Sequence, residues 1–188
     1  MRYVDPDGKC AFGSDADEIN YICNTKLANV LRNCIGATYS HKRPPTNAEM
    51  DCSGMLVYAL NKMGYEVPAN LDAATMASGK IGWIVLYDDI SEERQGLEGT
   101  LNFYDFEGRG IDHVNYGVGR RGTESENQIM DASFGLTWQT GRNKSNRQDV
   151  KAEGNKVNKT YSPFSTKTSP EKQGYIDFTK LKRKQEND

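Results

Sequence analysis

The order of the hydrophobic patterns along this 188-residue chain predicts an α+β fold, with helices first and an antiparallel sheet after them. Up to about residue 78, apolar residues recur three and four positions apart, which is typical of amphipathic helices. From residue 83 onward, short β-branched and aromatic runs are separated by turns rich in Gly and charged residues, which is typical of strands. The chain contains no internal repeat, so we expect one domain.

The first helix is expected over residues 15–34, after a turn-rich N-terminal extension of residues 1–14. Ser14 and, three positions later, Asp17 approximate a capping box at its start. Apolar residues then follow at helical spacing, and Gly36 provides a stop.

The second expected helix, residues 52–63, starts with a cysteine. Asp51 is a typical N-cap, and Gly64 ends the helix. Cys52 therefore lies in the first turn of a mostly apolar helix, where unsatisfied N–H groups and the positive end of the helix dipole favour a thiolate. A nucleophilic cysteine needs this environment, but a buried structural cysteine at a helix start fits the pattern as well.

A short helix over residues 71–78 leads into the strand region. The strands are expected at residues 83–87, 101–106, 113–119, 128–132 and 174–178. Residues 139–173 carry eight Lys/Arg against three Asp/Glu and few apolar residues, which predicts a polar, basic loop or insertion. We therefore divide the chain into the extension, a core of residues 15–138, this basic segment, and a last strand with a charged tail over residues 174–188.

Composition excludes several classes of function. A net charge of −2 gives no general reason to expect nucleic-acid binding. The four cysteines show no Cys-x-x-Cys spacing and the chain has two histidines, so we expect no zinc site and no other cofactor. No apolar run is long enough to span a membrane, and the acidic N-terminus lacks the apolar core of a signal peptide.

A catalytic cysteine also needs a base, and the sequence offers His41 and His113. His41 lies in a proline-containing loop, residues 38–50, whereas His113 opens an expected strand. We favour His113, because a regular element holds a side chain in a more precise position than a loop does.

Several segments together resemble the NlpC-type cell-wall cysteine peptidases, whose fold is papain-like. They are Gly36-Ala37-Thr38-Tyr39, Asp51-Cys52-Ser53-Gly54, the strand Glu98–Tyr104, the His-Val-x-Tyr-x-x-Gly strand from His113 to Gly119, and Met130-Asp131-Ala132-Ser133. The likeness covers about residues 15–135. It implies that N-terminal helices, with the catalytic cysteine at a helix start, pack on an antiparallel sheet that carries the histidine.

The resemblance implies that Cys52 is the nucleophile, His113 the general base and Asp131 the residue that orients the histidine. In the family this last position is more often His, Asn or Gln, so Asp131 is a departure. A carboxylate can nevertheless hold the imidazole tautomer and stabilise an imidazolium. Ser133 and Asn115 are alternative orienting residues.

The resemblance further implies that Tyr39 is an active-site tyrosine, and that Asp51 and Ser53 bind the free amine of a peptidoglycan stem peptide. For Asp51, helix capping alone would be a sufficient explanation. Where the family usually has two glycines after its tyrosine, this chain has Ser40-His41-Lys42, so the substrate groove is expected to differ.

The activity that the resemblance implies is thiol-dependent hydrolysis of peptidoglycan stem peptides, at the bond between γ-D-glutamyl and the following diamino acid. Two alternatives stay open. One is an amidase or acyltransferase on the same fold, and the other is a non-catalytic phage tail or assembly protein. The expected absence of a signal peptide fits an enzyme that is made in the cytoplasm and delivered to the cell wall by a phage or secretion partner.

Overall fold

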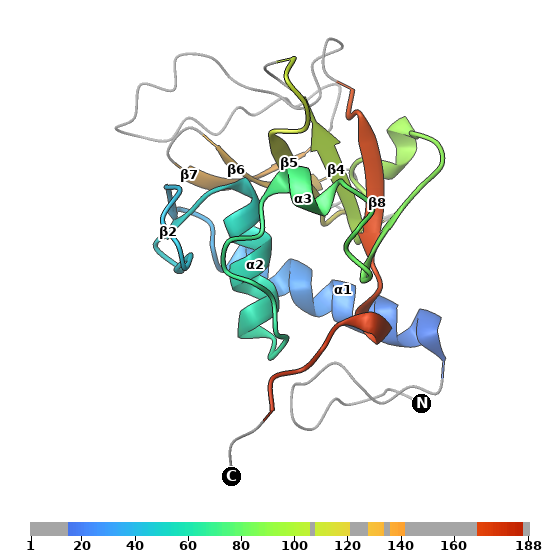
Figure 1. Cartoon of the computed structure of the whole chain (residues 1–188), viewed down its shortest axis with the longest axis horizontal. Coiled ribbons are helices and arrows are strands. Elements are labelled where there is room, and N and C mark those ends of the chain that lie inside the picture. The colour runs from blue at the N-terminus through green and yellow to red at the C-terminus, as the bar shows by residue number, and fades with distance from the viewer. Residues whose placement is uncertain (1–14, 106–107, 121–127, 134–135, 142–168, 186–188) are drawn as a thin grey trace.

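The computed structural model describes residues 15–105, 108–120, 128–133, 136–141 and 169–185 (Figure 1). Within these residues the chain has an α+β fold, as the sequence predicts: helices come first and pack on a largely antiparallel sheet. The sheet has eight strands in the order β2-β1-β7-β6-β5-β4-β8-β3, and β1 and β2 form its one parallel pair in the part of the chain that is described.

The first helix, α1, spans Ala16–Arg32, so the prediction of residues 15–34 is confirmed to within two residues at its C-terminal end. Its N-cap is Asp15, whose carboxylate accepts a hydrogen bond from the backbone N–H of Asp17. One face of α1 is buried in the core through Cys23, Leu27, Ala28 and Leu31.

The cysteine helix, α2, spans Cys52–Lys62 and packs against α1 and against strands β5 and β6 (Figure 1). Almost all of it is buried, which agrees with its nearly continuous apolar sequence. The third helix, α3, covers only Ala73–Met76, although residues 71–78 were expected to be helical. Its N-cap is Asp72, and Gly79, with a φ of 73°, follows soon after its end.

Five strands have bounds close to those predicted and form one side of the sheet. They are β3 (Ile84–Leu86), β4 (Thr100–Tyr104), β5 (His113–Gly117), β6 (Gln128–Ser133) and β8 (Lys172–Ile176). The last of them ends two residues earlier than expected, because Asp177 instead caps a 3₁₀ helix, η2, at Phe178–Lys180. A second 3₁₀ helix, η1, lies at Glu92–Arg94.

Three strands were not predicted, namely β1 (Thr38–Tyr39), β2 (Glu49–Met50) and β7 (Leu136–Gly141). They join the loop before the cysteine helix to the sheet, since Thr38 pairs with Leu136 of β7 and with Glu49 of β2. The expected polar loop of residues 139–173 is therefore partly strand. Its central part, residues 142–168, lies outside the described residues.

The C-terminal strand β8 lies between β4 and β3, and Figure 1 shows it beside β4. Along β4 and β5, successive side chains point to opposite faces of the sheet and so lie in two different environments. Leu101, Phe103, Val114 and Tyr116 join the hydrophobic core, whereas the residues between them are buried and polar. The catalytic candidate His113 belongs to this polar row.

Candidate active site

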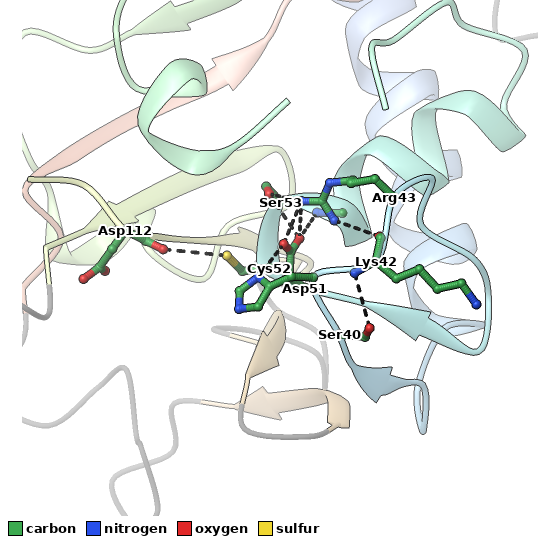
Figure 2. Close-up of polar contacts among 9 residues, drawn as sticks. Ser40, Lys42, Arg43, Asp51, Cys52, Ser53 and Asp112 are labelled. Carbon is green, nitrogen blue, oxygen red and sulfur yellow. Dashed lines mark hydrogen bonds and ion pairs between the residues drawn. The ribbon is translucent and has the colours of Figure 1, made fainter. Parts of the chain in front are cut away.

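The structure places Cys52 at the first position of α2, and its side chain is almost completely buried. The Sγ atom lies 4.0 Å from the backbone carbonyl oxygen of Asp112, the residue before His113 (Figure 2). The start of the cysteine helix and the start of strand β5 therefore meet, as the sequence interpretation requires.

His113, the first residue of β5, donates a hydrogen bond through Nε2 to Oδ1 of Asp131 on β6, at 2.7 Å. The side chains are 7% and 0% exposed, so water contributes little to this pair. Asp131 Oδ2 is buried and has no hydrogen-bond partner among the described residues. The carboxylate thus directs its charge mainly to the imidazole, which is what an orienting residue requires.

The electrostatic surroundings of His113 favour its charged form. Burial by itself lowers the pKa of the imidazole, but the charge and hydrogen bond of Asp131 and the neighbouring Cys52 outweigh burial. As a result, the pKa of His113 is raised well above its usual value. The surroundings thus favour an imidazolium next to the sulfur of Cys52, and an adjacent imidazolium stabilises a thiolate.

Tyr39, at the end of β1, lies close enough to the site for its pKa to respond to it. Burial raises the pKa of the phenol most, and the charges of Cys52, Asp51 and Asp131 raise it further. The phenol therefore keeps its proton and can act as a hydrogen-bond donor beside Cys52. The short strand β1, which the sequence did not predict, is the element that holds this side chain at the site.

Asp51 and Ser53 lie together at the start of α2, but they contact Arg43 rather than an open space (Figure 2). Arg43 Nη2 donates to Asp51 Oδ1 at 2.8 Å and to Oδ2 at 2.6 Å, and it lies 3.1 Å from Ser53 Oγ. Burial tends to raise the pKa of Asp51, but the hydrogen bonds from Arg43 and from the Gly54 N–H hold it below its usual value. Asp51 is thus both the helix cap and half of an ion pair.

The sequence interpretation did not single out Arg43. A signal was present, because a carboxylate at the start of an apolar helix, next to Cys52, is expected to need a positive partner, and the preceding loop contains His41-Lys42-Arg43. Gly54 is a second residue with a role beyond the helix pattern. A Cβ atom there would lie 2.9 Å from Arg43 Nη1 and 2.8 Å from Asp51 Oδ1, so glycine allows the guanidinium to pack on the helix start.

The remaining candidates are placed away from the reacting groups or outside the described part. His41 has an 80% exposed side chain and contacts Asp51 Oδ2 at 3.1 Å. Asn115 accepts a hydrogen bond from Asn102 and donates one to Tyr104, so it belongs to the buried amide network beside the site. The side chain of Ser133 lies outside the described residues.

No other functional group is evident in the part of the chain that the structure describes. It contains no cluster of three or more His, Cys, Asp or Glu that could hold a metal ion. Over the same residues, no helix has the length and apolarity needed to cross a membrane.

Comparison with known proteins gave limited matches. No family model and no curated protein matches the chain. Among solved structures, it is similar to NlpC2 from Trichomonas vaginalis, at 18% identity and a TM-score of 0.49, over 72% of this chain and 45% of that one. NlpC1 from the same organism gives the same identity, TM-score and coverage of this chain, over 42% of its own. The chain thus spans less than half the length of either protein.

Proposed function

We propose that this protein is a cysteine peptidase that hydrolyses an amide bond in peptidoglycan stem peptides. The observation that carries the proposal is that Cys52, at a helix start, lies against the Asp112–His113 segment, and that the His113 ring is bound by the buried Asp131 at 2.7 Å. A nucleophile, a base and an orienting carboxylate from three separate elements form the arrangement that thiol hydrolysis requires.

In the first half of the reaction, the Cys52 sulfur attacks the carbonyl carbon, and the displaced electron pair moves to the carbonyl oxygen. The backbone N–H of Cys52 and the hydroxyl of Tyr39 are the donors we assign to this oxyanion. Nε2 of His113 is bound to Asp131, so we assign proton transfer to Nδ1. The imidazolium gives its proton to the leaving amine as the C–N bond breaks, which leaves a thioester on Cys52.

In the second half, His113 accepts a proton from water, and the resulting hydroxide attacks the thioester carbon. The C–S bond breaks, the acid is released and the thiolate–imidazolium pair is restored. The resemblance of the sequence supports the bond between γ-D-glutamyl and a diamino acid as the one that is cut. Delivery to the cell wall by a phage or secretion partner belongs to the same proposal.

The decisive experiment is digestion of purified peptidoglycan by the wild type and by Cys52→Ala and His113→Ala, with release of new amino groups as the readout. We expect Cys52→Ala to abolish hydrolysis and His113→Ala to reduce it at least about 10²-fold, without unfolding the protein, and full activity in either would overturn the assignment. Mass analysis of the products identifies the bond that is cut. It also separates cleavage within the stem peptide from an amidase or acyltransferase reaction.

Alkylation by iodoacetamide, resolved by peptide mass analysis, tests whether the site is catalytic or only structural. Cys34 is the matched control, because it is a buried thiol whose pKa is raised by burial to about 11. We expect Cys52 to react much faster than Cys34 at neutral pH. Equal, slow labelling of both thiols would instead favour the non-catalytic assembly protein.

A further inference from the structure

The surroundings of Asp51 leave no room for another cation. Its side chain is 7% exposed, and a carboxylate offers about four lone-pair sites. Five contacts fill them: Gly54 N at 2.6 Å, Arg43 Nη2 to both oxygens, Ser53 Oγ at 3.1 Å and His41 Nδ1 at 3.1 Å. A substrate ammonium could reach this carboxylate only by displacing the guanidinium or the 80% exposed ring of His41. Displacing the ring alone would leave the ammonium beside the guanidinium, which still contacts both carboxylate oxygens.

Several contacts together hold the side chain of Arg43 in its position. Its Nη1 donates to the backbone carbonyl of Lys42, and its Nη2 contacts Asp51 and Ser53. The absence of a Cβ at Gly54 provides the space, and the side chain of Arg43 is only 23% exposed. Displacing the guanidinium would therefore separate a nearly buried ion pair, which is strongly unfavourable.

We propose that Arg43 is a specificity-determining residue that closes the Asp51 carboxylate to substrate ammonium groups, so that the enzyme accepts peptides whose amino end is blocked in an amide linkage. This inference rests on the function proposed above. It replaces the expectation that Asp51 and Ser53 bind a free amine. Asp51 and Arg43 form an ion pair without net charge next to Cys52. An amide group of the substrate is also uncharged, so it needs no counter-ion at this position.

The substrate class that follows is the stem peptide still attached through its amino end, as opposed to a released peptide with a free amino terminus. A free ammonium would enter beside Arg43 without a partner of opposite charge, and it would have to give up its hydration. Selection would therefore act against the free amine, because the Asp51 carboxylate is already paired with Arg43 and does not compensate the lost hydration of the ammonium.

The test compares two substrates that differ only at the amino end, a synthetic stem peptide with a free amine and the same peptide acetylated. For the wild type we expect kcat/KM for the acetylated peptide to equal or exceed that for the free amine. In Arg43→Gln, the uncovered Asp51 carboxylate can bind the ammonium. The ratio should then shift at least about tenfold toward the free amine.

Two further variants show whether the shift comes from the carboxylate. Lys42→Gln removes a neighbouring positive charge that pairs with Glu49 at 2.7 Å, and it should leave the ratio unchanged. Adding Asp51→Asn to Arg43→Gln keeps an N-cap but removes the negative charge, so the ratio should return toward that of the wild type.

The outcomes of this test are distinct. A wild type that prefers the free amine, or a ratio that Arg43→Gln does not change in a folded protein, overturns the role of Arg43 alone. Hydrolysis of neither peptide by the wild type overturns the proposed function. The wild-type ratio decides the matter even if Arg43→Gln does not fold, and thermal melting reports whether it does.

Discussion

Two His–Asp pairs flank Cys52, and they differ in almost every respect other than residue type. His113 and Asp131 lie on adjacent strands at 2.7 Å, with side chains 7% and 0% exposed. His41 and Asp51 lie at 3.1 Å, but His41 belongs to a loop and is 80% exposed. In addition, Asp51 is shared with Arg43, whereas no cation other than His113 pairs with Asp131 among the described residues. Two pairs of the same residue types thus differ, because the burial of the carboxylate and the number of its other partners decide how strongly it interacts with the imidazole.

The largest expected effect separates the two histidines. His113→Ala removes the proposed general base and should lower the hydrolysis rate by roughly 10²- to 10⁴-fold. His41→Ala removes an exposed ring that contacts Tyr39 and Asp51, and it should change the rate by less than about threefold. Initial rates on purified peptidoglycan compare them directly. Equal losses in both variants would remove the distinction between the pairs.

Asp131→Asn should have the next largest effect, because it removes the charge that holds the proton on His113. We expect the pKa of His113 to fall and the hydrolysis rate to drop at least about tenfold, since each pKa unit corresponds to tenfold in equilibrium. The chain has two histidines, so NMR titration of the ring protons follows both at once. An unchanged His113 titration in this variant would assign the orienting role to another residue.

The interaction of His113 with Asp131 should also make the free energy of unfolding depend on pH, and this effect is expected to be smaller than the losses of activity. The raised pKa of His113 means that the folded state binds this proton more tightly than the unfolded state. The stabilisation is fully present below about pH 6.5 and is lost as pH rises through the folded-state pKa. Its size is about 1.4 kcal/mol for each unit of the shift.

Urea unfolding at a series of pH values measures this contribution, with His113→Gln as the variant that lacks it. Above pH 6.5, the free energy of unfolding of the wild type should decline with pH relative to that of His113→Gln. Parallel curves for the two proteins would show that the imidazolium does not stabilise the fold.

The parts of the fold that the sequence predicted are those with strong local signals. The helix start at Cys52 follows from the Asp51 cap and the apolar run after it, and strand β5 follows from its β-branched and aromatic residues. The two-residue strands β1 and β2 have no such signal. They exist because Thr38 pairs with distant residues, and periodicity carries no information on such pairing.

The residues of the candidate site also divide into those with a local sequence signal and those that only the tertiary structure reveals. Local context indicated Cys52 and His113, and the structure brings these two residues together with Asp131. Arg43 was missed because the partner of a loop side chain depends on the tertiary structure, which the local sequence does not show. In addition, helix capping already explained the sequence around Asp51. A residue with one sufficient local explanation can thus have a second role that only the fold shows.

The smallest expected effect concerns the exposed histidine and completes the comparison. His41→Gln should change the free energy of unfolding by less than about 0.5 kcal/mol at pH 6, even though it removes a contact to a carboxylate at 3.1 Å. The reason is that Arg43 and the Gly54 N–H already satisfy Asp51, and an exposed ion pair is screened by water. The measurement is urea unfolding beside His113→Gln. A loss above 1 kcal/mol would mean that His41 helps to hold Asp51, and the two pairs would then differ in degree and not in kind.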